Sequence, residues 1–281
     1  TVTSILQCAG NRAAEDMAAT GASGFAGTPF ETITQGMVGN AQWRGVRLAD
    51  VLRALYPDAC AACRRHGGGE WHVVFEGADG YSASSPLARL LDPANDCLLA
   101  THMNGAPLSP DHGYPMRALL PGLAGARNVK WLQSVSLQES PVEAPWNAYY
   151  YKNAKAEQIQ ELPLQSLILS HEMKIGDGVL EVKGVAYGGG SGTPIAKVEV
   201  STDGGVSWGL AQVHADEVLE DGSSKSFGWV RWTARVASGD DGEAAVRVCC
   251  RATDAQGMSQ VEVSQKQRGY LYNGWHAVVV E

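Results

Sequence analysis

The sequence predicts an α+β domain followed by a β-sandwich of the immunoglobulin type. Over roughly the first 155 residues, stretches with helical spacing of apolar residues alternate with short strand-like runs. Beyond that point the helical spacing disappears, and strand-length runs follow one another between glycine-rich turns. We therefore expect two domains, residues 1–155 and 156–281, with a polar linker over residues 151–162.

The first domain is expected to mix short helices and strands. An alternating apolar run predicts a strand that ends at Cys8, and the Pro- and Gly-rich stretch Leu108–Pro115 predicts a loop. Leucines spaced three and four residues apart predict helices, whereas short apolar runs predict strands. The expected elements are helices at Leu48–Leu55 and Leu87–Leu91, and strands at Trp71–Phe75, Cys97–His102 and Val129–Leu137.

The second domain is expected to contain seven strands. Their regular spacing, with turns such as Gly188-Gly-Gly190 and Asp203-Gly-Gly205, is typical of an antiparallel sandwich. The expected strands are Leu164–Leu169, Val179–Ala186, Ala196–Thr202, Trp208–Val213, Trp229–Val236, Ala244–Ala252 and Gln260–Val263.

The composition excludes several classes of partner. The chain has 281 residues, 44% of them hydrophobic, and a formal net charge of −8 at pH 7. No block rich in Lys and Arg occurs, which argues against binding to nucleic acid or to an anionic membrane. No apolar run approaches the roughly 18–20 residues that span a bilayer. The chain does not begin with Met, and we expect it to be part of a longer protein.

Six scattered cysteines in a chain of this length do not predict a disulfide framework. Cys60-Ala-Ala-Cys63, with His66 close behind, has the beginning of a zinc-site spacing but lacks a second ligand pair. A surface turn after a helix is the favoured interpretation, and zinc is the alternative. Cys249 and Cys250 lie inside an apolar strand run and are expected in the core.

The run Leu6-Gln-Cys8-Ala-Gly-Asn-Arg12 places a thiol at the end of a strand, directly before a Gly-Asn turn. Arg12 would favour the ionised form of this thiol. A thiolate in this position is suited to two kinds of chemistry, because it can act as a metal ligand or as a nucleophile.

A basic block runs from Asp111-His-Gly-Tyr-Pro-Met-Arg117 to Gly125-Ala-Arg-Asn-Val-Lys-Trp131. It combines cationic side chains with glycines that expose backbone N–H groups, and this combination suits a bound anion such as phosphate. The usual phosphate motifs, Gly-x-Gly-x-x-Gly after a strand and Gly-Lys-Ser/Thr, are absent from the sequence. A solvated surface is the alternative interpretation.

These stretches resemble the sulfite oxidase family. The Cys8 run is similar to the family's cysteine loop, and the basic block is similar to its pterin-binding segment. The similar motifs occur in the family's order over nearly the whole chain. Further similar stretches are Trp43-x-Gly45-Val, Asp50-Val-Leu52, Ile159–Ser166, Gly188–Gly190, Val198–Trp208 and Arg268–His276.

The resemblance implies a partial molybdopterin-binding domain followed by an immunoglobulin-like dimerisation domain, with Mo-molybdopterin as the cofactor. Cys8 would bind the molybdenum, for which a soft sulfur ligand is suited. Tyr151 would lie at the reacting centre, and Arg268 would bind the anionic substrate. The pterin and its phosphate would be held by Asp79, His112, Arg117, Asn128, Val129 and Lys130.

The resemblance also implies a reaction and its partners. Sulfite would be oxidised to sulfate, and the electrons would pass to an acceptor such as a haem domain, cytochrome c or oxygen. The chain would be a homodimer or a subunit of a larger complex. Its location would be the mitochondrion, with the periplasm as the alternative.

Two positions depart from the family's pattern. Ala13 follows Arg12 where the family has a second arginine, and Ile33 stands where a pocket tryptophan is expected. The family's N-terminal part would lie before Thr1. These departures support an alternative hypothesis, a catalytically impaired or inactive subunit with a structural role in a larger assembly, in which Mo-molybdopterin would be absent.

Overall fold

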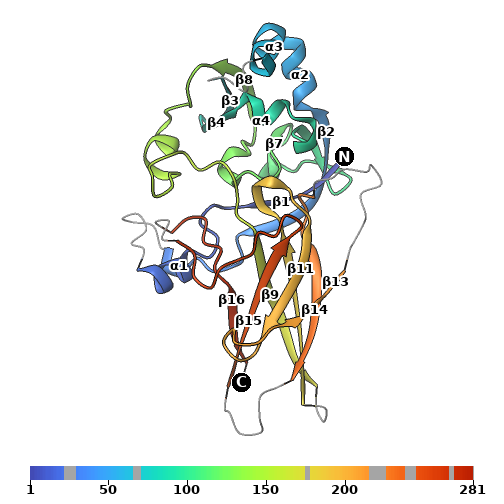
Figure 1. Ribbon diagram of the computed structural model, residues 1–281. Coiled ribbons are helices and arrows are strands. Elements are labelled where there is room, and N and C mark those ends of the chain that lie inside the picture. Colours follow the sequence, from blue (N-terminus) through green and yellow to red (C-terminus); the bar gives the residue numbers. More distant parts are fainter. Residues whose placement is uncertain are drawn as a thin grey trace.

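The N-terminal half of the chain is built on two antiparallel sheets, and the C-terminal half is a sandwich of two more (Figure 1). The computed structural model describes residues 1–21, 30–65, 71–174, 178–214, 226–237, 245–265 and 269–280. The two halves stack along one long axis, and β1 lies where they meet. The predicted fold class, an α+β domain followed by a β-sandwich, is therefore confirmed.

The sheets of the N-terminal half are joined by short helices. No helix in the described ranges is long and apolar enough to cross a membrane. The first sheet has the order β1 (Val2–Gln7), β2 (Val38–Arg47), β5 (Leu98–Met103) and β6 (Ala106–Pro107), with β7 (Arg117–Leu119) beside β5. The second has the order β4 (Ser82–Pro86), β3 (His72–Gly77) and β8 (Leu132–Gln138). The helices are α1 (Ala13–Thr20), α2 (Leu48–Leu55), α3 (Pro57–Arg65) and α4 (Leu87–Leu91).

The core of the N-terminal half contains the apolar faces of α2 and α4. Leu48 and Leu52 lie one turn apart on α2, as Leu87 and Leu90 do on α4, and all four side chains are buried against Phe75 and its neighbours. The apolar spacing thus predicted both helices with the bounds that the structure shows.

The Cys60-x-x-Cys63 stretch lies on the buried face of a helix. Both thiols lie on α3 and are 1% and 4% exposed within the same core, because a spacing of three residues puts them on one helix face. The expected surface turn is therefore wrong. His66 lies outside the described residues. In the part of the chain that is described, no three His, Cys, Asp or Glu side chains are grouped so that they could hold a metal ion.

The C-terminal half encloses its core between two four-stranded sheets. Inward-facing residues such as Val182, Val248 and Trp232 fill this core. The indole of Trp232 lies over Gly184, where a Cβ atom would come within 2.3 Å of a ring carbon. One sheet has the order β13 (Gln212–His214), β14 (Val230–Ala237), β10 (Val179–Tyr187) and β9 (Gln165–Lys174). The other has the order β12 (Gly209–Leu210), β11 (Ile195–Ser201), β15 (Val246–Asp254) and β16 (His276–Val280).

Two of the predicted strands differ from the structure. The run Trp208–Val213 forms two short strands in different sheets, because β12 pairs with β11 whereas β13 pairs with β14. The run Gln260–Val263 is not a strand. The segment before it makes an isolated bridge from Ser259 to Thr253, and β16 pairs with the other part of β15 instead.

A further apolar cluster joins the two halves. Ile5 and Ala9, on either side of Cys8, pack in this cluster together with Tyr187 of β10. The Ile5 N–H donates to the Phe227 carbonyl at 2.9 Å, and the Leu271 N–H donates to the Ala9 carbonyl at 2.8 Å. The strand and turn that carry Cys8 are therefore in direct contact with the C-terminal sandwich.

We predict that His276 makes stability depend on pH. This β16 side chain is buried, and its Nδ1 accepts the Ile168 N–H at 3.0 Å. Burial, together with the charge of Arg12, lowers the pKa of His276 to about 4. The unfolded chain, with a histidine pKa near 6.5, binds the proton more readily. The free energy of unfolding should therefore fall by up to about 1.4 kcal/mol per pH unit as the pH drops from about 6.5 towards 4.

The measurement is urea unfolding between pH 7.5 and 4.5 for the wild type and for His276→Gln, which keeps an acceptor but cannot titrate. The difference in the free energy of unfolding between the two proteins should shrink steadily as the pH falls. A difference that stays constant over this range would contradict the prediction.

Candidate functional site

The Cys8 thiol is held in a tight turn between β1 and α1. The Cys8 N–H donates to the Met37 carbonyl at 3.0 Å, and the Asn11 N–H donates to the Cys8 carbonyl at 3.0 Å. The Gly10 N–H points at the sulfur, 3.4 Å from Sγ. Burial raises the pKa of the Cys8 thiol, and the Gly10 N–H opposes that shift by favouring the thiolate. The thiol is free and partly accessible.

Arg12 does not serve this thiol, contrary to the sequence expectation. Its guanidinium is fully buried and donates to Gln165 Oε1 at 2.9 Å and to the carbonyls of Gly274 and Trp275 at 2.7 and 3.0 Å. Both carboxylate oxygens of Glu15 complete its bonds, at 2.9 and 2.6 Å. Every guanidinium nitrogen thus points towards the C-terminal half or α1.

A second segment, η4 (Gly125–Arg127), lies directly against the Cys8 turn. A Cβ atom on Gly125 would lie 3.1 Å from the Gln7 carbonyl oxygen and 3.7 Å from the Cys8 nitrogen. The next residue of η4, Ala126, accepts a hydrogen bond from the Tyr81 hydroxyl at 2.8 Å. The close approach favours glycine, because a Cβ atom would be tight against the Gln7 carbonyl, and it brings η4, Tyr81 and the Cys8 turn together.

Tyr151 belongs to the same neighbourhood. It packs against the apolar cluster that contains Ala9, and its ring centroid lies 5.8 Å from that of Tyr270. Burial raises the pKa of Tyr151, and the nearby Cys8 raises it further. Of the three adjacent tyrosines, Tyr149 and Tyr150 are 72% and 40% exposed, so Tyr151 is the one that faces inward.

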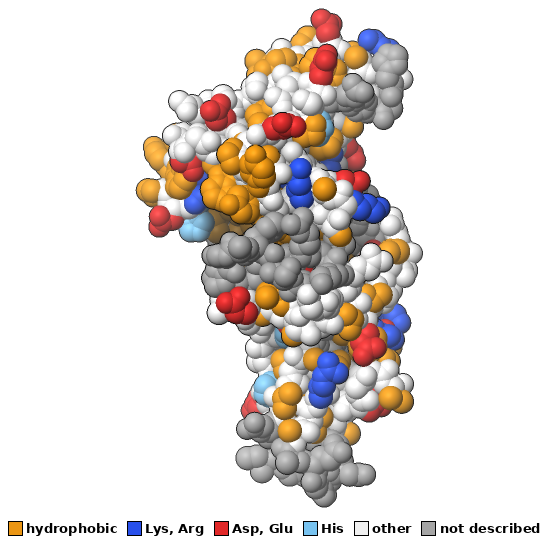
Figure 2. All heavy atoms as spheres, turned by 90° about the vertical axis from the view of Figure 1, so that its left-hand side faces the viewer, with side chains coloured by type: hydrophobic (Ala, Val, Ile, Leu, Met, Phe, Trp, Pro, Cys, Tyr) orange, Lys and Arg blue, Asp and Glu red, His pale blue; other side chains and the backbone are white. Residues whose placement is uncertain are grey.

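The surface beside Tyr151 is aromatic. Trp146 and Tyr150 of the π-turn η5 (Trp146–Tyr150) have ring centroids 5.4 Å apart, and Tyr81 lies 6.5 Å from Trp146. Figure 2 shows hydrophobic side chains gathered on this face of the N-terminal half. The candidate site is therefore bordered by exposed rings.

The basic block forms a second group of predicted residues. Arg117, which is buried on β7, donates to the carbonyls of His112 and Asn128, each at 3.1 Å. Lys130 Nζ donates to the Asp111 carbonyl at 2.9 Å. The structure thus brings His112, Arg117 and Lys130 together around the turn η3 (Pro110–His112). Burial lowers the pKa of Arg117 to about 10.

Three other predicted cofactor residues are engaged with the fold itself. The Asn128 side chain accepts the Leu120 N–H at 2.7 Å and donates to the Ala124 carbonyl at 3.1 Å. The Val129 side chain is buried in the N-terminal core. Asp79 lies in an exposed turn and accepts the Tyr81 N–H at 3.1 Å. Asp79 keeps an accessible carboxylate for a ligand, whereas the side chains of Asn128 and Val129 are used internally.

The two positions that depart from the family's pattern lie side by side. Ala13 is fully buried in the cluster that joins the halves, and Ile33 packs against the same cluster. Neither of these two side chains carries a charge. Arg268, the predicted substrate residue, lies outside the described residues.

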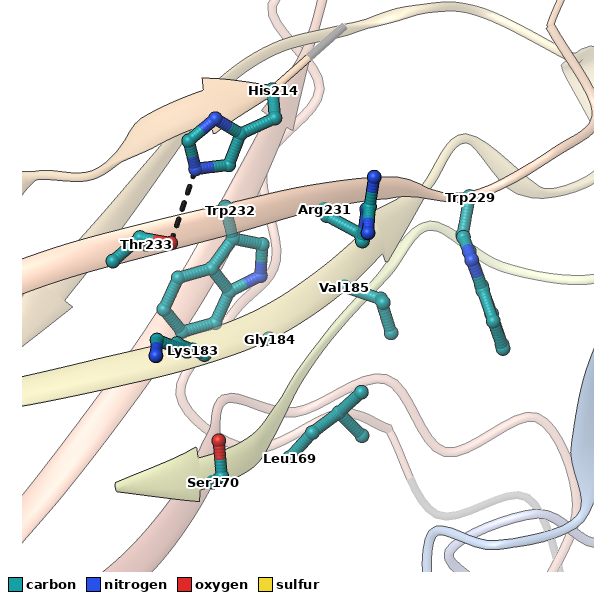
Figure 3. Close-up of a pocket in the computed structure, with 10 residues that line it drawn as sticks. All are labelled: Leu169, Ser170, Lys183, Gly184, Val185, His214, Trp229, Arg231, Trp232 and Thr233. Carbon is teal, nitrogen blue, oxygen red and sulfur yellow. Dashed lines mark hydrogen bonds between the residues drawn. The ribbon is translucent and has the colours of Figure 1, made fainter. Parts of the chain in front are cut away.

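A cavity of about 510 Å³ lies elsewhere, on the β13–β14–β10–β9 sheet (Figure 3). Lys183, Arg231 and His214 are among the residues that line it, and His214 Nε2 lies 3.1 Å from Thr233 Oγ1. None of the predicted site residues lines it. It is separate from the Cys8 site.

Comparison with known proteins identifies the domain to which each half of the chain belongs. Residues 1–146 match the model of the oxidoreductase molybdopterin-binding domain, and residues 156–281 match that of the Mo-co oxidoreductase dimerisation domain. The chain therefore combines a molybdopterin-binding domain with a dimerisation domain of the Mo-co oxidoreductase type. It belongs to the sulfite oxidase family.

Two relatives illustrate the similarity. The chain is 35% identical to the mitochondrial sulfite oxidase of Drosophila melanogaster over all of its length and 51% of the relative. It is 36% identical to the human mitochondrial sulfite oxidase over 99% of its length and 52% of the relative. The chain thus spans about half the length of these curated relatives.

One solved structure has the same fold. The sulfane dehydrogenase SoxCD of Paracoccus pantotrophus superposes with a TM-score of 0.74 and 25% identity, over 100% of this chain and 68% of that chain. The similarity covers both halves of the chain together.

The residues present fit a molybdenum cofactor. Cys8 offers one accessible soft ligand, and Arg117 has a buried Nε that lacks a hydrogen-bond partner beside Lys130 and His112. A phosphate group accepts hydrogen bonds from such a set of donors. A thiol and a buried cationic nitrogen are the kinds of group that could hold the metal and the phosphate of a molybdopterin.

Sequence reasoning missed two residues of this neighbourhood, Tyr81 and Arg127. Tyr81 follows the turn that contains Asp79, and Arg127 directly precedes Asn128. Their positions next to predicted residues are the only feature of the sequence that points to them as site residues. Nothing in the sequence shows that Arg127 is fully buried or that it lies on the segment that contacts Cys8.

We predict that Arg12 is required for stability, because it joins the Cys8 turn to the C-terminal half. Arg12→Met would leave the buried carbonyl and amide acceptors without a donor, and should lower the free energy of unfolding by about 3–5 kcal/mol. Urea unfolding measures this loss, with the exposed Arg44→Met as the matched control. Equal stability of the two variants would contradict the structural role.

Proposed function

We propose that this chain oxidises sulfite to sulfate at a Mo-molybdopterin centre bound by Cys8. The observation that supports this most directly is the thiol in its tight turn, with η4, Tyr81 and Tyr151 gathered against it. The relatives that are named sulfite oxidases support the substrate.

The cofactor would supply the redox chemistry, in which sulfite and water give sulfate, two protons and two electrons. The protein would bind the cofactor, position the substrate and neutralise the negative charge of both. The Cys8 thiolate would anchor the metal, and the Gly10 N–H would stabilise the negative charge on its sulfur. Its position at the end of β1 fixes where the metal sits.

At the other end, Arg117, Lys130 and His112 would bind the pterin phosphate through charge-assisted hydrogen bonds. Asp79 would accept a hydrogen bond from the pterin. Asn128 and Val129 would contribute through the backbone of the segment that they hold in place, because their side chains are engaged in the fold.

Two residues would act on the substrate. The Tyr151 hydroxyl would donate a hydrogen bond to an oxygen at the reacting centre, since burial favours its protonated form. Arg268 would bind the anion by charge. A planar guanidinium that binds two oxygens at once is well suited to this task.

The partners follow from the same relationship. Electrons would leave to a haem domain, cytochrome c or oxygen. The match of residues 156–281 to a dimerisation domain supports a homodimer, or a place in a larger complex. The mitochondrial relatives support a mitochondrial location, with the periplasm as the alternative.

A second candidate is a catalytically impaired subunit with a structural role. It is favoured by Ala13, whose methyl group is fully buried where the family's pattern has an arginine.

The sulfane dehydrogenase of the same fold supports a different possibility, a sulfur substrate other than sulfite.

The test is the molybdenum and pterin content of the protein, produced in a host that makes the cofactor. We expect about one molybdenum per chain and an absorption change on addition of sulfite. Cys8→Ser should lose most of the metal and the sulfite response, because an alcohol is a poor soft-metal ligand. The far-UV circular dichroism should be unchanged.

Cys63→Ala is the matched control, because this thiol lies in the core of the N-terminal half. It should keep its molybdenum. Wild-type protein without molybdenum or pterin, and without any response to sulfite, would contradict the enzymatic proposal and favour the structural one.

A further inference from the structure

Arg127 is a fully buried guanidinium with one nitrogen that has no partner. Its Nε donates to the Ile159 carbonyl at 2.7 Å, and its Nη1 donates to Asn147 Oδ1 at 2.5 Å. The remaining nitrogen, Nη2, is buried without a hydrogen bond. Neither acceptor is charged, so neither compensates the positive charge of Arg127.

Such a group is costly to keep. A guanidinium keeps its proton near neutral pH, and a charge taken out of water without a counter-ion costs several kcal/mol. Burial accordingly lowers the pKa of Arg127. Buried polar atoms in native proteins nearly always have a partner, so a free cationic nitrogen points to an anion that binds there.

The Arg127 guanidinium lies beside the segment that carries Tyr151. The guanidinium is planar, and Nη2 lies beside the two nitrogens that bind Asn147 and Ile159. These acceptors flank Tyr151: Asn147 lies one turn before it in η5, and the Ile159 N–H donates to the Tyr151 carbonyl at 2.9 Å. The Arg127 guanidinium therefore lies close to Tyr151, and its charge acts on the Tyr151 hydroxyl.

Arg127 is also part of the segment that contacts the Cys8 turn. It ends η4, and the first residue of that segment, Gly125, lies against Gln7 and Cys8. The middle residue binds Tyr81 through its carbonyl. Through η4, Arg127 is thus connected to the Cys8 turn and to Tyr81.

Two other arginines, of which Arg12 is fully buried and Arg89 partly buried, each have a carboxylate nearby. Arg12 is paired with Glu15, and Arg89 lies 3.7 Å from Glu161 while it donates to the carbonyls of Pro121 and Gly190. Each of them has a carboxylate nearby and donates hydrogen bonds to backbone carbonyls of the fold. In the described part of the chain, no ion pair of this kind accompanies Arg127.

We propose that Arg127 binds the substrate oxyanion at the Cys8 centre and supplies the positive charge that Ala13 cannot. The ligand is a small sulfur oxyanion, sulfite or its product sulfate, with one oxygen accepting a hydrogen bond from Nη2. The Tyr151 hydroxyl is the neighbouring donor. The inference rests on the proposed function, since it names a substrate-binding residue of that same site.

The experiment measures sulfate binding to the full chain, as isolated, by equilibrium dialysis with labelled sulfate. The variants are Arg127→Met, Arg127→Lys and, as the matched control, Arg89→Met. We expect one site per chain in the wild type and in Arg89→Met. Loss of one charge-assisted hydrogen bond should weaken binding about 10- to 100-fold in Arg127→Met, with partial recovery in Arg127→Lys.

Steady-state kinetics and cofactor analysis give independent readouts. Arg127→Met should raise the KM for sulfite about 10- to 100-fold with less than a threefold change in kcat, and its molybdenum and pterin content should equal that of the wild type. Circular dichroism and thermal unfolding confirm that each variant is folded. Arg127→Lys, which keeps the charge, provides the test should Arg127→Met fail to fold.

Three outcomes would overturn the proposal. Sulfate binding in Arg127→Met or Arg127→Lys that equals the wild type would show that the guanidinium does not contact the anion. A fall in pterin or molybdenum content, with unchanged sulfate affinity per chain, would assign Arg127 to the cofactor. Absence of a sulfate site in the wild type would also reject it. Sulfate bound through Arg127 in a chain without molybdenum would support the anion site while rejecting the proposed oxidase.

Discussion

The candidate site depends on the buried guanidinium of Arg12, which holds the Cys8 turn against the C-terminal sandwich. Arg12 has a left-handed backbone, with φ of 67°, and so redirects the chain from the Cys8 turn into α1. A non-glycine residue in this conformation costs about 1 kcal/mol or more. The hydrogen bonds to Gln165, Gly274 and Trp275 offset that strain. One side chain thereby sets both the position of the thiol and the contact between the two halves.

The site combines three nearby parts of the fold. The Cys8 turn ends β1, the segment η4 lies against it through Gly125, and Tyr151 follows the aromatic π-turn. Arg117 and Arg127 each keep a buried nitrogen without a partner, one among the predicted pterin residues and the other beside Tyr151. A donor that is fixed before its ligand arrives costs no reorganisation on binding. The arrangement therefore suits anions at both ends of a cofactor site.

Much of the fold could be predicted from local patterns, and the exceptions have physical causes. The helices at Leu48–Leu55 and Leu87–Leu91 follow from apolar spacing, because each buries one leucine face. β2 escapes prediction because glycines and polar residues interrupt its alternation, although it pairs with β1 and β5. β16 was missed because its run is short and begins with His276, a polar side chain that the fold buries. Pairing with distant strands decided both cases.

The sequence by itself determined the class of this protein, since the ordered motifs around Cys8, His112 and Arg117 carry the resemblance that the family matches support. It also showed that Ala13 stands where the resemblance led us to expect a second arginine. Only the tertiary structure shows which arginine side chains keep a nitrogen without a hydrogen-bond partner. Arg12 lies in the predicted Cys8 stretch and Arg127 directly precedes Asn128, yet all guanidinium nitrogens of Arg12 have partners whereas Arg127 keeps one nitrogen without a partner. A side chain's partners come from segments far away in the sequence, and no local pattern specifies them.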